Sequence, residues 1–499
     1  MDRISIDQVV QFGKTHLSFP LDPAAMQKLS LLRTKVESKL TDGHAVYGVN
    51  TGFGFFSTCV IPKKDLLQLQ LNIVRSHACG VGEPLALEWV RALLSVKLHN
   101  FLQGGSGIRP ECITALWNLL QHDILPVIPR KGSVGASGDL APLAHLALAL
   151  IGEGEVFWKG TRMPTAEALE KAGLTPYVLQ EKEGLSLLNG TQVMSTLAAF
   201  ALWEAQNLLD AADRVSALSL TAFDAVLEPF DARIHDLRPH PGQVLVAKNI
   251  RVLLELPETH MPRTSTRVQD PYSFRCIPQV HGAARDGIAY CVQVIERELN
   301  SITDNPVVTA EGDLLSGGNF HGQYVAQVMD LTRIVMTDLS SISERRLDKL
   351  LCPSFSQLPA LLTENGGLES GFMIPQYVAA ALVSENKVLS HPASIDTIPT
   401  SLNKEDHVSM GPISCHKALE INQNVAKVLA IEALAACQAM DLRTTCLRSA
   451  PVEQLYQQIR SKIPYVQQDR SLSAEIELVA SWLLNGVWGD LSVEYKEAV

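Results

Sequence analysis

The tripeptide Ala136-Ser137-Gly138, within GSVGASGDLAPLAH, brings together small residues that could form an electrophile from backbone atoms. Because Gly138 lacks a Cβ atom, its nitrogen can approach the carbonyl of Ala136 closely. Attack on that carbonyl with loss of water, followed by loss of the Ser137 hydroxyl, would give an imidazolone ring with an exocyclic methylidene carbon. Such a carbon would react with nucleophiles, so the stretch indicates covalent catalysis.

The same stretch has simpler interpretations, of which an ordinary turn is the plainest. A nucleophile elbow requires Gly-x-Ser-x-Gly, but the segment that begins at Gly135 ends in Asp139. A phosphate-binding loop requires Gly-Lys-Ser/Thr, and Lys131 precedes the glycines. An alternative from a different enzyme class is an amidase-like serine hydrolase, in which Ser137 would be the nucleophile and Lys131 would lie near it.

Helices must position this tripeptide. Asp139 is suited to cap the helix that follows, and Pro142 would fall in its first turn, where a missing N–H costs little. The electrophile would then lie near the positive end of a helix dipole.

Helical periodicity also dominates the rest of the chain. Apolar residues recur every three or four positions over 328–342, which indicates one face of an amphipathic helix, whereas 425–439 is apolar almost all round. Similar patterns cover 193–218 and 280–302. We therefore expect a mainly α fold with a bundle of long antiparallel helices.

Glycine- and proline-rich segments interrupt these patterns. The segment 104–110, GGSGIRP, predicts a boundary between a smaller N-terminal region, 1–107, and a helical bundle domain, 108–499. Segments 258–278 and 352–375 lack a helical stripe, and we expect loops long enough to be functional.

Composition limits the class of protein. Hydrophobic residues make up 46% and charged residues 19% of the 499-residue chain, which is typical of a globular fold. The net charge of −11 disfavours nucleic acid or an anionic membrane as the main partner, so a small molecule is expected. The nine cysteines form no CxxC pair, and no targeting segment or apolar span stands out, so we expect a cytoplasmic protein with free thiols.

The sequence 132–148, GSVGASGDLAPLAHLAL, resembles along its whole length the signature of the histidine and aromatic amino-acid ammonia-lyases. Other blocks resemble that family's blocks in the same order: YGVNTGFG (47–54), SHACGVGEPL (76–85), LLNGTQ (187–192), QDPYSFRC (269–276), SGGNFHG (316–322) and NKEDHVSMG (403–411). The resemblance covers most of the chain. It implies a helical bundle of the ammonia-lyase/aspartase-like type and a homotetramer whose active sites are shared between subunits.

The resemblance further implies a 4-methylidene-imidazol-5-one group, formed autocatalytically from Ala136, Ser137 and Gly138, and no metal. The family's reaction removes ammonia, a poor leaving group, together with a β-proton that is barely acidic. The methylidene electrophile would assist by bonding to the substrate through its amine or, in an alternative mechanism, through its side-chain ring.

Five positions that match the family's blocks are candidate catalytic residues. Besides Ser137, the resemblance implies that Tyr47 removes the β-proton, provided that nearby donors lower its pKa. Asn189 would stabilise negative charge on the ring oxygen. Tyr272 would lie near the substrate ring, and Glu405 would transfer a proton. Each of these residue types, taken singly, is more often structural.

Three further positions are candidates for substrate binding. The planar guanidinium of Arg275 suits the substrate carboxylate, because it can make two parallel hydrogen bonds. Gln269 lies in the same expected loop and would support it. Phe320 would wall the cavity and exclude water. A surface ion pair for Arg275 and core packing for Phe320 are the ordinary alternatives.

Two positions bear on the substrate. Ser76-His77 resembles the histidine-specific members of the family, whereas members acting on phenylalanine or tyrosine have Phe-Leu or His-Leu there. Glu405 stands where the aromatic lyases commonly carry Gln. An imidazole and a carboxylate can hydrogen-bond both nitrogens of a substrate imidazole, while a phenyl ring would leave them without partners.

The resemblance therefore implies non-oxidative deamination of L-histidine to trans-urocanate and ammonia, the first step of histidine degradation. A tyrosine or phenylalanine ammonia-lyase, or an aminomutase with the same prosthetic group, is the alternative.

Two other interpretations account for less of the sequence. In DARIHDLRPHPGQ, the potential metal ligands at spacings of four and five are Asp231, His235, Asp236 and His240. No HExxH is present and Pro-Gly breaks the helical alignment, so no metal site is expected. A non-enzymatic helical scaffold would explain the buried helices but leaves the loop chemistry unexplained.

Overall fold

The computed structural model describes residues 3–15, 20–40, 46–262, 265–444, 446 and 448–488. The chain divides into two compact units. The first unit comprises Met1–Phe200, Val292–Asp330 and Pro392–His416, and the second comprises Ala201–Cys291, Leu331–His391 and Lys417–Val499. The expected boundary after residue 107 falls inside the first unit, where residues 104–108 are buried. The division into an N-terminal region, 1–107, and a bundle domain, 108–499, stays a prediction.

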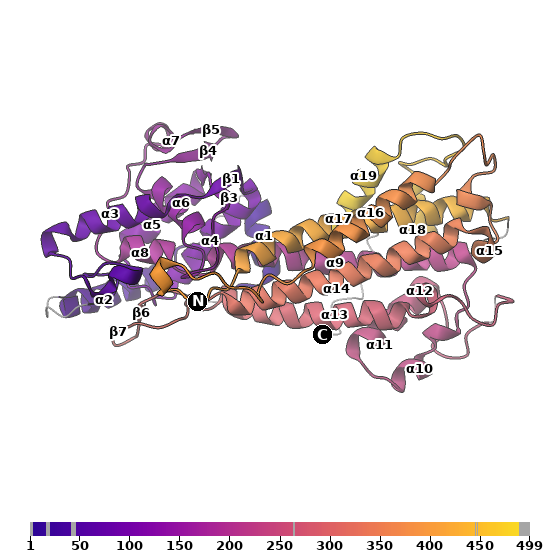
Figure 1. Ribbon diagram of the computed structural model, residues 1–499, viewed down its shortest axis with the longest axis horizontal. Coiled ribbons are helices and arrows are strands. Elements are labelled where there is room, and N and C mark those ends of the chain that lie inside the picture. Colours follow the sequence, from indigo (N-terminus) through magenta and orange to yellow (C-terminus); the bar gives the residue numbers. More distant parts are fainter. Residues whose placement is uncertain are drawn as a thin grey trace. The chain divides into compact units, whose positions relative to one another are not determined.

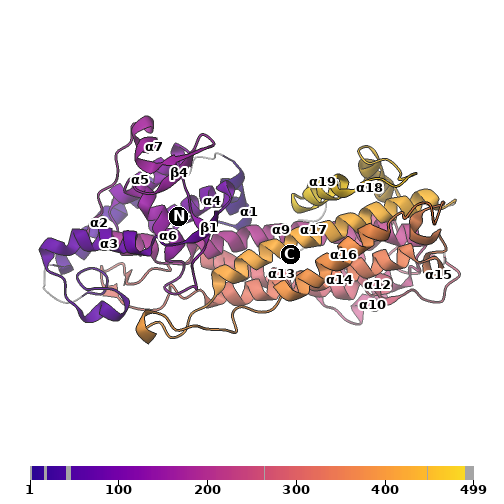
Figure 2. The same cartoon turned by 45° about the horizontal axis from the view of Figure 1, so that its top comes forward.

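Four long helices confirm the apolar patterns of the sequence: α9 (Gln192–Phe223), α13 (Ile277–Leu299), α14 (Gln323–Leu351) and α17 (Gly411–Leu442). In the second unit they run side by side with α16 (Met373–Leu389), as both views show (Figure 1, Figure 2). The mainly α fold is therefore confirmed, with α13 running opposite to α9, α14 and α17.

Helix α17 contains a long stretch that is buried on all sides. Residues 428–440 are all buried, as the nearly continuous apolar run predicts. The one carboxylate in that stretch, Glu432, accepts hydrogen bonds from Arg346 Nε at 2.6 Å and from the hydroxyls of Ser219 and Ser343 at 2.6 Å each. A buried charge is tolerated because it is paired and hydrogen-bonded on every side.

The first unit surrounds its part of the long helices with short helices and small antiparallel sheets (Figure 1). Its α-helices are α1 (Ile6–Lys14), α2 (Pro23–Leu40), α3 (Leu66–His77), α4 (Leu87–Leu102), α5 (Pro110–Gln121), α6 (Ala141–Leu150), α7 (Thr165–Ala172) and α8 (Glu183–Leu188). Its 3-10 helices are η1 (Gly54–Thr58), η2 (Lys63–Asp65) and η5 (Ser401–Asn403).

The strands of this unit are short. Strand β1 (Val81–Pro84) pairs with β3 (Pro129–Lys131), and β6 (Val307–Val308) pairs with β7 (Leu314–Leu315). A third sheet has the order β2 (Leu125–Pro126), β4 (Glu155–Trp158) and β5 (Thr161–Pro164), with Val156 opposite Met163. All these pairs are antiparallel.

The second unit adds shorter elements to the long helices: η3 (Glu228–Phe230), α10 (Ala232–Asp236), α11 (Pro241–Leu253), α12 (Tyr272–Arg275), α15 (Pro353–Ser356), η4 (Ala360–Leu362), α18 (Ala450–Arg460) and α19 (Ser473–Leu484). The described part of the expected loop 258–278 is irregular except for α12 and the first residues of α13. The expected loop 352–375 is irregular except for α15, η4 and the first residues of α16. Among the described residues, no helix combines the length and apolarity that crossing a bilayer requires.

Candidate active site

A cavity of about 550 Å³ in the first unit brings together five of the sequence-predicted site residues. They are Tyr47, His77, Ser137, Asn189 and Glu405. They come from widely separated parts of the chain: the turn before η1, the end of α3, the loop before α6, the end of α8 and the segment after η5. The apolar part of the lining includes Phe53, Ile73 and Leu185.

The backbone around Ser137 is folded into a tight left-handed turn. Ser137 has φ 49° and Gly138 has φ 80°, a region that costs energy for a residue with a side chain. A Cβ atom at Gly138 would lie 2.1 Å from the carbonyl oxygen of Gly190, so no other residue fits there. The loop is fixed from the other side by Met410, whose N–H donates to the carbonyl of Val134 at 2.9 Å.

The expectation that Asp139 caps the helix after it is wrong. The N-cap residue of α6 is Leu140, which makes no side-chain cap bond, although Pro142 does lie in the first turn. The buried Asp139 carboxylate instead accepts the N–H groups of Val193 at 2.6 Å and Met194 at 3.1 Å, at the start of α9. Burial raises the pKa of Asp139 to about 7, against the lowering effect of these two donors.

Tyr47 lies in the cavity with its phenol oxygen accepting the N–H of Gly54 at 3.3 Å. Burial raises the pKa of Tyr47 above its usual 10.0; the Gly54 donor opposes this, and the Glu405 charge adds to it. The condition set for Tyr47 as a base, a pKa lowered by surrounding donors, is therefore not met here, because desolvation of the phenolate outweighs the single donor.

His77 and Glu405 supply the polar groups of the cavity that suit an imidazole. Burial lowers the pKa of His77 below 6.5, with the Ile73 carbonyl and the Glu405 charge opposing it, so the ring is neutral at pH 7. Its Nδ1 lies 3.0 Å from the Ser76 hydroxyl. Glu405 Oε2 accepts the hydroxyl of Thr400 at 3.1 Å, which fixes the carboxylate at the cavity.

Asn189 is held from behind by a buried polar network. Its side-chain nitrogen donates to the carbonyl of Asn305 at 2.7 Å and to Asp304 Oδ1 at 3.3 Å, and Lys182 pairs with Asp304 Oδ2 at 3.0 Å. The carbonyl oxygen of Ser137 instead accepts a hydrogen bond from the backbone N–H of Gly190, at 3.3 Å. A role for the Asn189 side chain at that oxygen stays a prediction.

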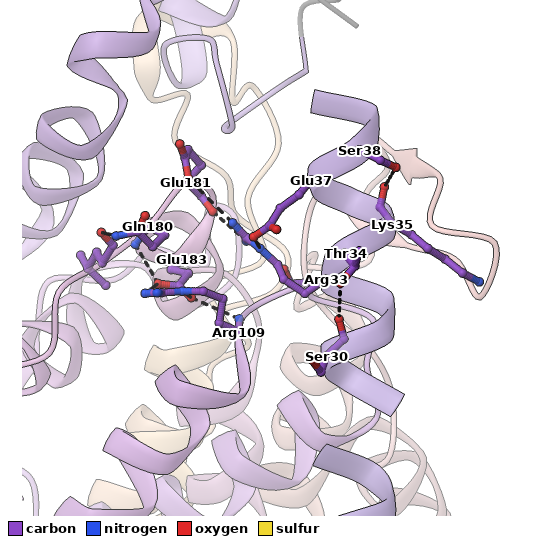
Figure 3. Close-up of polar contacts among 12 residues, drawn as sticks. Ser30, Arg33, Thr34, Lys35, Glu37, Ser38, Arg109, Gln180, Glu181 and Glu183 are labelled. Carbon is purple, nitrogen blue, oxygen red and sulfur yellow. Dashed lines mark hydrogen bonds and ion pairs between the residues drawn. The ribbon is translucent and has the colours of Figure 1, made fainter. Parts of the chain in front are cut away.

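Arginines anchor the segment that leads into α8 and hence to Asn189 (Figure 3). Arg33, on α2, donates to the carbonyls of Gly107 and Glu181 at 3.1 Å each. Arg109 Nε donates to Glu183 Oε1 at 3.0 Å, and its backbone N–H donates to the same oxygen at 3.1 Å. In the figure the Arg33 guanidinium lies next to Glu181, and the Arg109 guanidinium lies next to Glu183. The start of α8 is thereby fixed in place.

Three other predicted residues, Gln269, Tyr272 and Arg275, belong to the second unit. Gln269 and Arg275 line a cavity of about 320 Å³ there, and Tyr272 is 71% exposed with its ring 4.5 Å from the Arg275 guanidinium carbon. Among the described residues, nothing hydrogen-bonds the buried Nε of Arg275. The guanidinium thus has one unpaired donor beside this cavity, which is consistent with an anionic ligand.

Phe320 lies half-buried in the turn before α14 and is not among the residues that line the cavity around Ser137. Its expected role as a wall of the substrate site stays a prediction.

The Asp231–His240 segment has structural partners. Asp231 caps α10 and pairs with Arg233 at 2.8 Å, and the ring of His235 lies between the Pro229 carbonyl and Gln243, at 3.0 Å each. In the described ranges, no group of three or more His, Cys, Asp or Glu side chains is arranged to hold a metal ion.

Sequence reasoning missed the supporting residues of the site. Thr400 holds Glu405, Asp304 holds Asn189, and a buried lysine, Lys97, contacts the backbone of Asn189. A signal was available for Lys97, which stands in the run LLSVKLHNFL, where a charged residue among apolar helix positions indicates a buried polar contact.

Comparisons with known proteins agree with this site. A family model for aromatic amino acid lyases matches residues 4–461. A histidine ammonia-lyase of Myxococcus xanthus is 47% identical over 489 residues, which cover 97% of this chain and 96% of the relative.

Solved structures give the same result. The crystal structure of histidine ammonia-lyase from Trypanosoma cruzi matches with a TM-score of 0.90 at 40% identity, covering 97% of this chain and 92% of that one. Tyrosine aminomutase from Streptomyces globisporus matches with a TM-score of 0.92 at 35% identity, covering 98% and 96%. The family model and these near-full-length relatives show that the chain belongs to the aromatic amino acid lyase family.

Proposed function

We propose that this carbon–nitrogen lyase removes ammonia from L-histidine to give trans-urocanate, using a 4-methylidene-imidazol-5-one formed from Ala136, Ser137 and Gly138. The observation that carries the proposal is the single cavity lined by Tyr47, His77 and Ser137 together with Asn189 and Glu405. The 47% identity to the Myxococcus xanthus histidine ammonia-lyase supports the same substrate.

The residues present fit this prosthetic group. Ring closure needs a bend at Ser137 and an unobstructed nitrogen at Gly138, and the positive φ angles of both residues provide that bend. Gly138 can only be glycine, because Gly190 O occupies the space of a Cβ. The N–H of Asp139 donates to that same Gly190 oxygen at 2.8 Å, which holds the end of the tripeptide in place.

When formed, the group supplies an electrophilic carbon that helps ammonia to leave. Ala136 packs with Val408 and Met410 in a small apolar cluster, which holds the first residue of the tripeptide in place. Tyr47 is the candidate base for the β-proton. It starts protonated at neutral pH because its pKa is raised, and it must lose its proton before it can act.

The substrate imidazole is recognised by His77 and Glu405. The neutral ring of His77 can donate to the unprotonated nitrogen of the substrate imidazole, and the carboxylate of Glu405 can accept the N–H of the other ring nitrogen. A phenol or phenyl side chain would leave one of these half-buried groups unpaired, which lowers the affinity for tyrosine and phenylalanine.

The substrate carboxylate is bound by Arg275 from another copy of the chain in a homotetramer, with Gln269 and Tyr272 beside it and Phe320 closing the site. The unpaired Nε of Arg275 and the small cavity that Arg275 lines support an anion-binding role. Neither nucleic acid nor a membrane takes part in the reaction, and the enzyme works in the cytoplasm.

The experiment that tests the proposal is turnover with L-histidine, L-tyrosine and L-phenylalanine in separate reactions. The proposal expects ammonia and the absorbance of a conjugated acrylate with L-histidine, at far higher kcat/KM than with the other two. Cinnamate or coumarate formation, or a β-amino acid product, without turnover of histidine would replace it with an aromatic lyase or an aminomutase.

A further inference from the structure

Lys97, on α4, is a buried ammonium group that contacts the backbone beside the candidate site. Its side chain is 1% exposed. Its Nζ donates to the carbonyls of Ser186 and Asn189 at 2.9 Å each and to Gln192 Oε1 at 3.0 Å. All three ammonium protons therefore have acceptors, and one of these acceptors is the peptide bond between Asn189 and Gly190.

This lysine is unlike the other buried lysine of the first unit. Lys182 pairs directly with Asp304 at 3.0 Å, whereas the acceptors of Lys97 are two backbone carbonyls and the side-chain amide oxygen of Gln192. Burial lowers the pKa of Lys97 to about 8, while the charges of Asp304 and Asp139 oppose that shift. A cation without a direct carboxylate partner is expensive to bury, so its position needs a reason beyond packing.

The peptide bond between Asn189 and Gly190 connects Lys97 to Ser137. Its carbonyl accepts the Lys97 ammonium at 2.9 Å, and its N–H, on Gly190, donates to the carbonyl oxygen of Ser137 at 3.3 Å. A charged donor on the oxygen of an amide polarises the amide, and its N–H becomes a stronger donor.

The Ser137 oxygen is where charge collects during formation of the proposed ring. In one dehydration, the Gly138 nitrogen bonds to the Ala136 carbonyl carbon, and the Ala136 oxygen leaves as water with the Gly138 and Ser137 amide protons. In the other, Ser137 loses its α-proton and its hydroxyl as water. Removal of that α-proton places negative charge on the Ser137 carbonyl oxygen, the atom to which the Gly190 N–H donates.

We infer that Lys97 is a positioning residue for prosthetic-group formation, which acts through the Asn189–Gly190 peptide to stabilise charge on the Ser137 carbonyl oxygen during loss of the serine hydroxyl. This inference rests on the proposed prosthetic group.

The test is the rate of dehydration of newly made protein, read by intact mass at successive times after a pulse of cell-free synthesis. Lys97→Met keeps the length of the side chain and removes the charge. We expect Lys97→Met to lose the water from Ser137 about tenfold more slowly than the unaltered chain. The effect is no larger because the Gly190 N–H, the donor that Lys97 strengthens, is still present. Lys97→Gln, a neutral donor, should fall between the two.

Lys182→Met is the matched control. It removes an equally buried ammonium that also contacts Ser186, and it breaks the ion pair with Asp304, but it does not touch the Asn189 carbonyl. It should dehydrate at close to the rate of the unaltered chain, even if its unfolding temperature falls as far as that of Lys97→Met.

The outcomes separate this inference from the proposed function. An unaltered, active chain that never loses water contradicts the prosthetic group itself. Normal dehydration of Lys97→Met overturns only the role of Lys97. An equal deficit in Lys182→Met, or loss of helical circular dichroism in both Lys97 variants, would also overturn it, because Lys97 would then serve stability alone.

Discussion

At the scale of single residues, the pKa of Tyr47 leads to a pH prediction. Burial raises this pKa above 10.0, so the fraction of phenolate in the free enzyme increases about tenfold per pH unit up to that value. We expect kcat/KM for L-histidine to rise with pH between neutrality and about pH 10.

Tyr47→Phe should remove that alkaline rise and lower kcat by about 10²-fold or more, because the general base is lost. The measurement is the pH profile of both proteins at saturating and limiting L-histidine. An alkaline rise of the same size in Tyr47→Phe would assign the proton transfer to another group.

Glu405 gives a second prediction at this scale. In the cavity it faces a neutral His77, so it is the charged partner for a substrate imidazole N–H. Replacing it in Glu405→Gln exchanges a charged acceptor for a neutral one, and a loss of about 2 kcal/mol in binding and turnover is expected for L-histidine.

The control for Glu405→Gln is the residual turnover of L-tyrosine, which offers no imidazole N–H. The ratio of kcat/KM for histidine over tyrosine should fall by more than tenfold. An equal loss for both substrates would contradict a role in recognition and leave only a general effect on the cavity.

At the scale of elements, Asp139 couples the reactive loop to α9. Its two oxygens accept the N–H groups of Val193 and Met194 inside the protein. Asp139→Ala leaves both donors unpaired, so we expect the free energy of unfolding to fall by about 2 kcal/mol or more. Thermal unfolding followed by circular dichroism checks this.

The matched control is Ser5→Ala, which removes an exposed cap from α1, where Ser5 and Gln8 form a capping box. It should cost only about 0.5–1 kcal/mol, because water replaces the lost acceptor. If Asp139→Ala were no more destabilising than Ser5→Ala, the Asp139 carboxylate would not be the cap that holds α9.

The elements that could be predicted from sequence are the long ones. A stripe over 328–342 and the apolar run over 425–439 each repeat a signal many times, and α14 and α17 follow from them. Strands of two to four residues, such as β2 and β4, carry too few positions for a pattern. The partner of Asp139 was assigned wrongly because the N–H groups it caps lie 54 and 55 residues further along the chain.

At the scale of the whole molecule, sequence alone identified the candidate residues but not which of them meet. Tyr47, His77 and Glu405 share a cavity with Ser137, whereas Arg275 lies in the second unit, in a different cavity. Motif order along the chain carries no information on this grouping, because long-range packing of the helices decides it.

This grouping predicts complementation between variants. If Arg275 serves the cavity of another copy, Ser137→Ala and Arg275→Met are each inactive alone, but hybrid oligomers made by co-expression regain a measurable part of the activity. In such hybrids, a cavity with an intact Ser137 can receive an intact Arg275 from a different chain.

The control pair is Ser137→Ala with Tyr47→Phe. Both residues line one cavity of the same unit and therefore come from the same chain. Every chain in the mixture carries one of the two substitutions, so no site has both residues intact. This pair should show no recovery beyond that of Tyr47→Phe alone. Equal recovery in both pairs, or none in either, would contradict sites shared between subunits.

The central claim concerns the covalent state of Ala136-Ser137-Gly138, and the mass of the purified, active protein tests it most directly. The account predicts an intact mass lower by two waters than the sequence requires, with the loss confined to the peptide that contains Ser137, and a full-mass, inactive but still helical Ser137→Ala. Active protein with an open, fully hydrated tripeptide would contradict it.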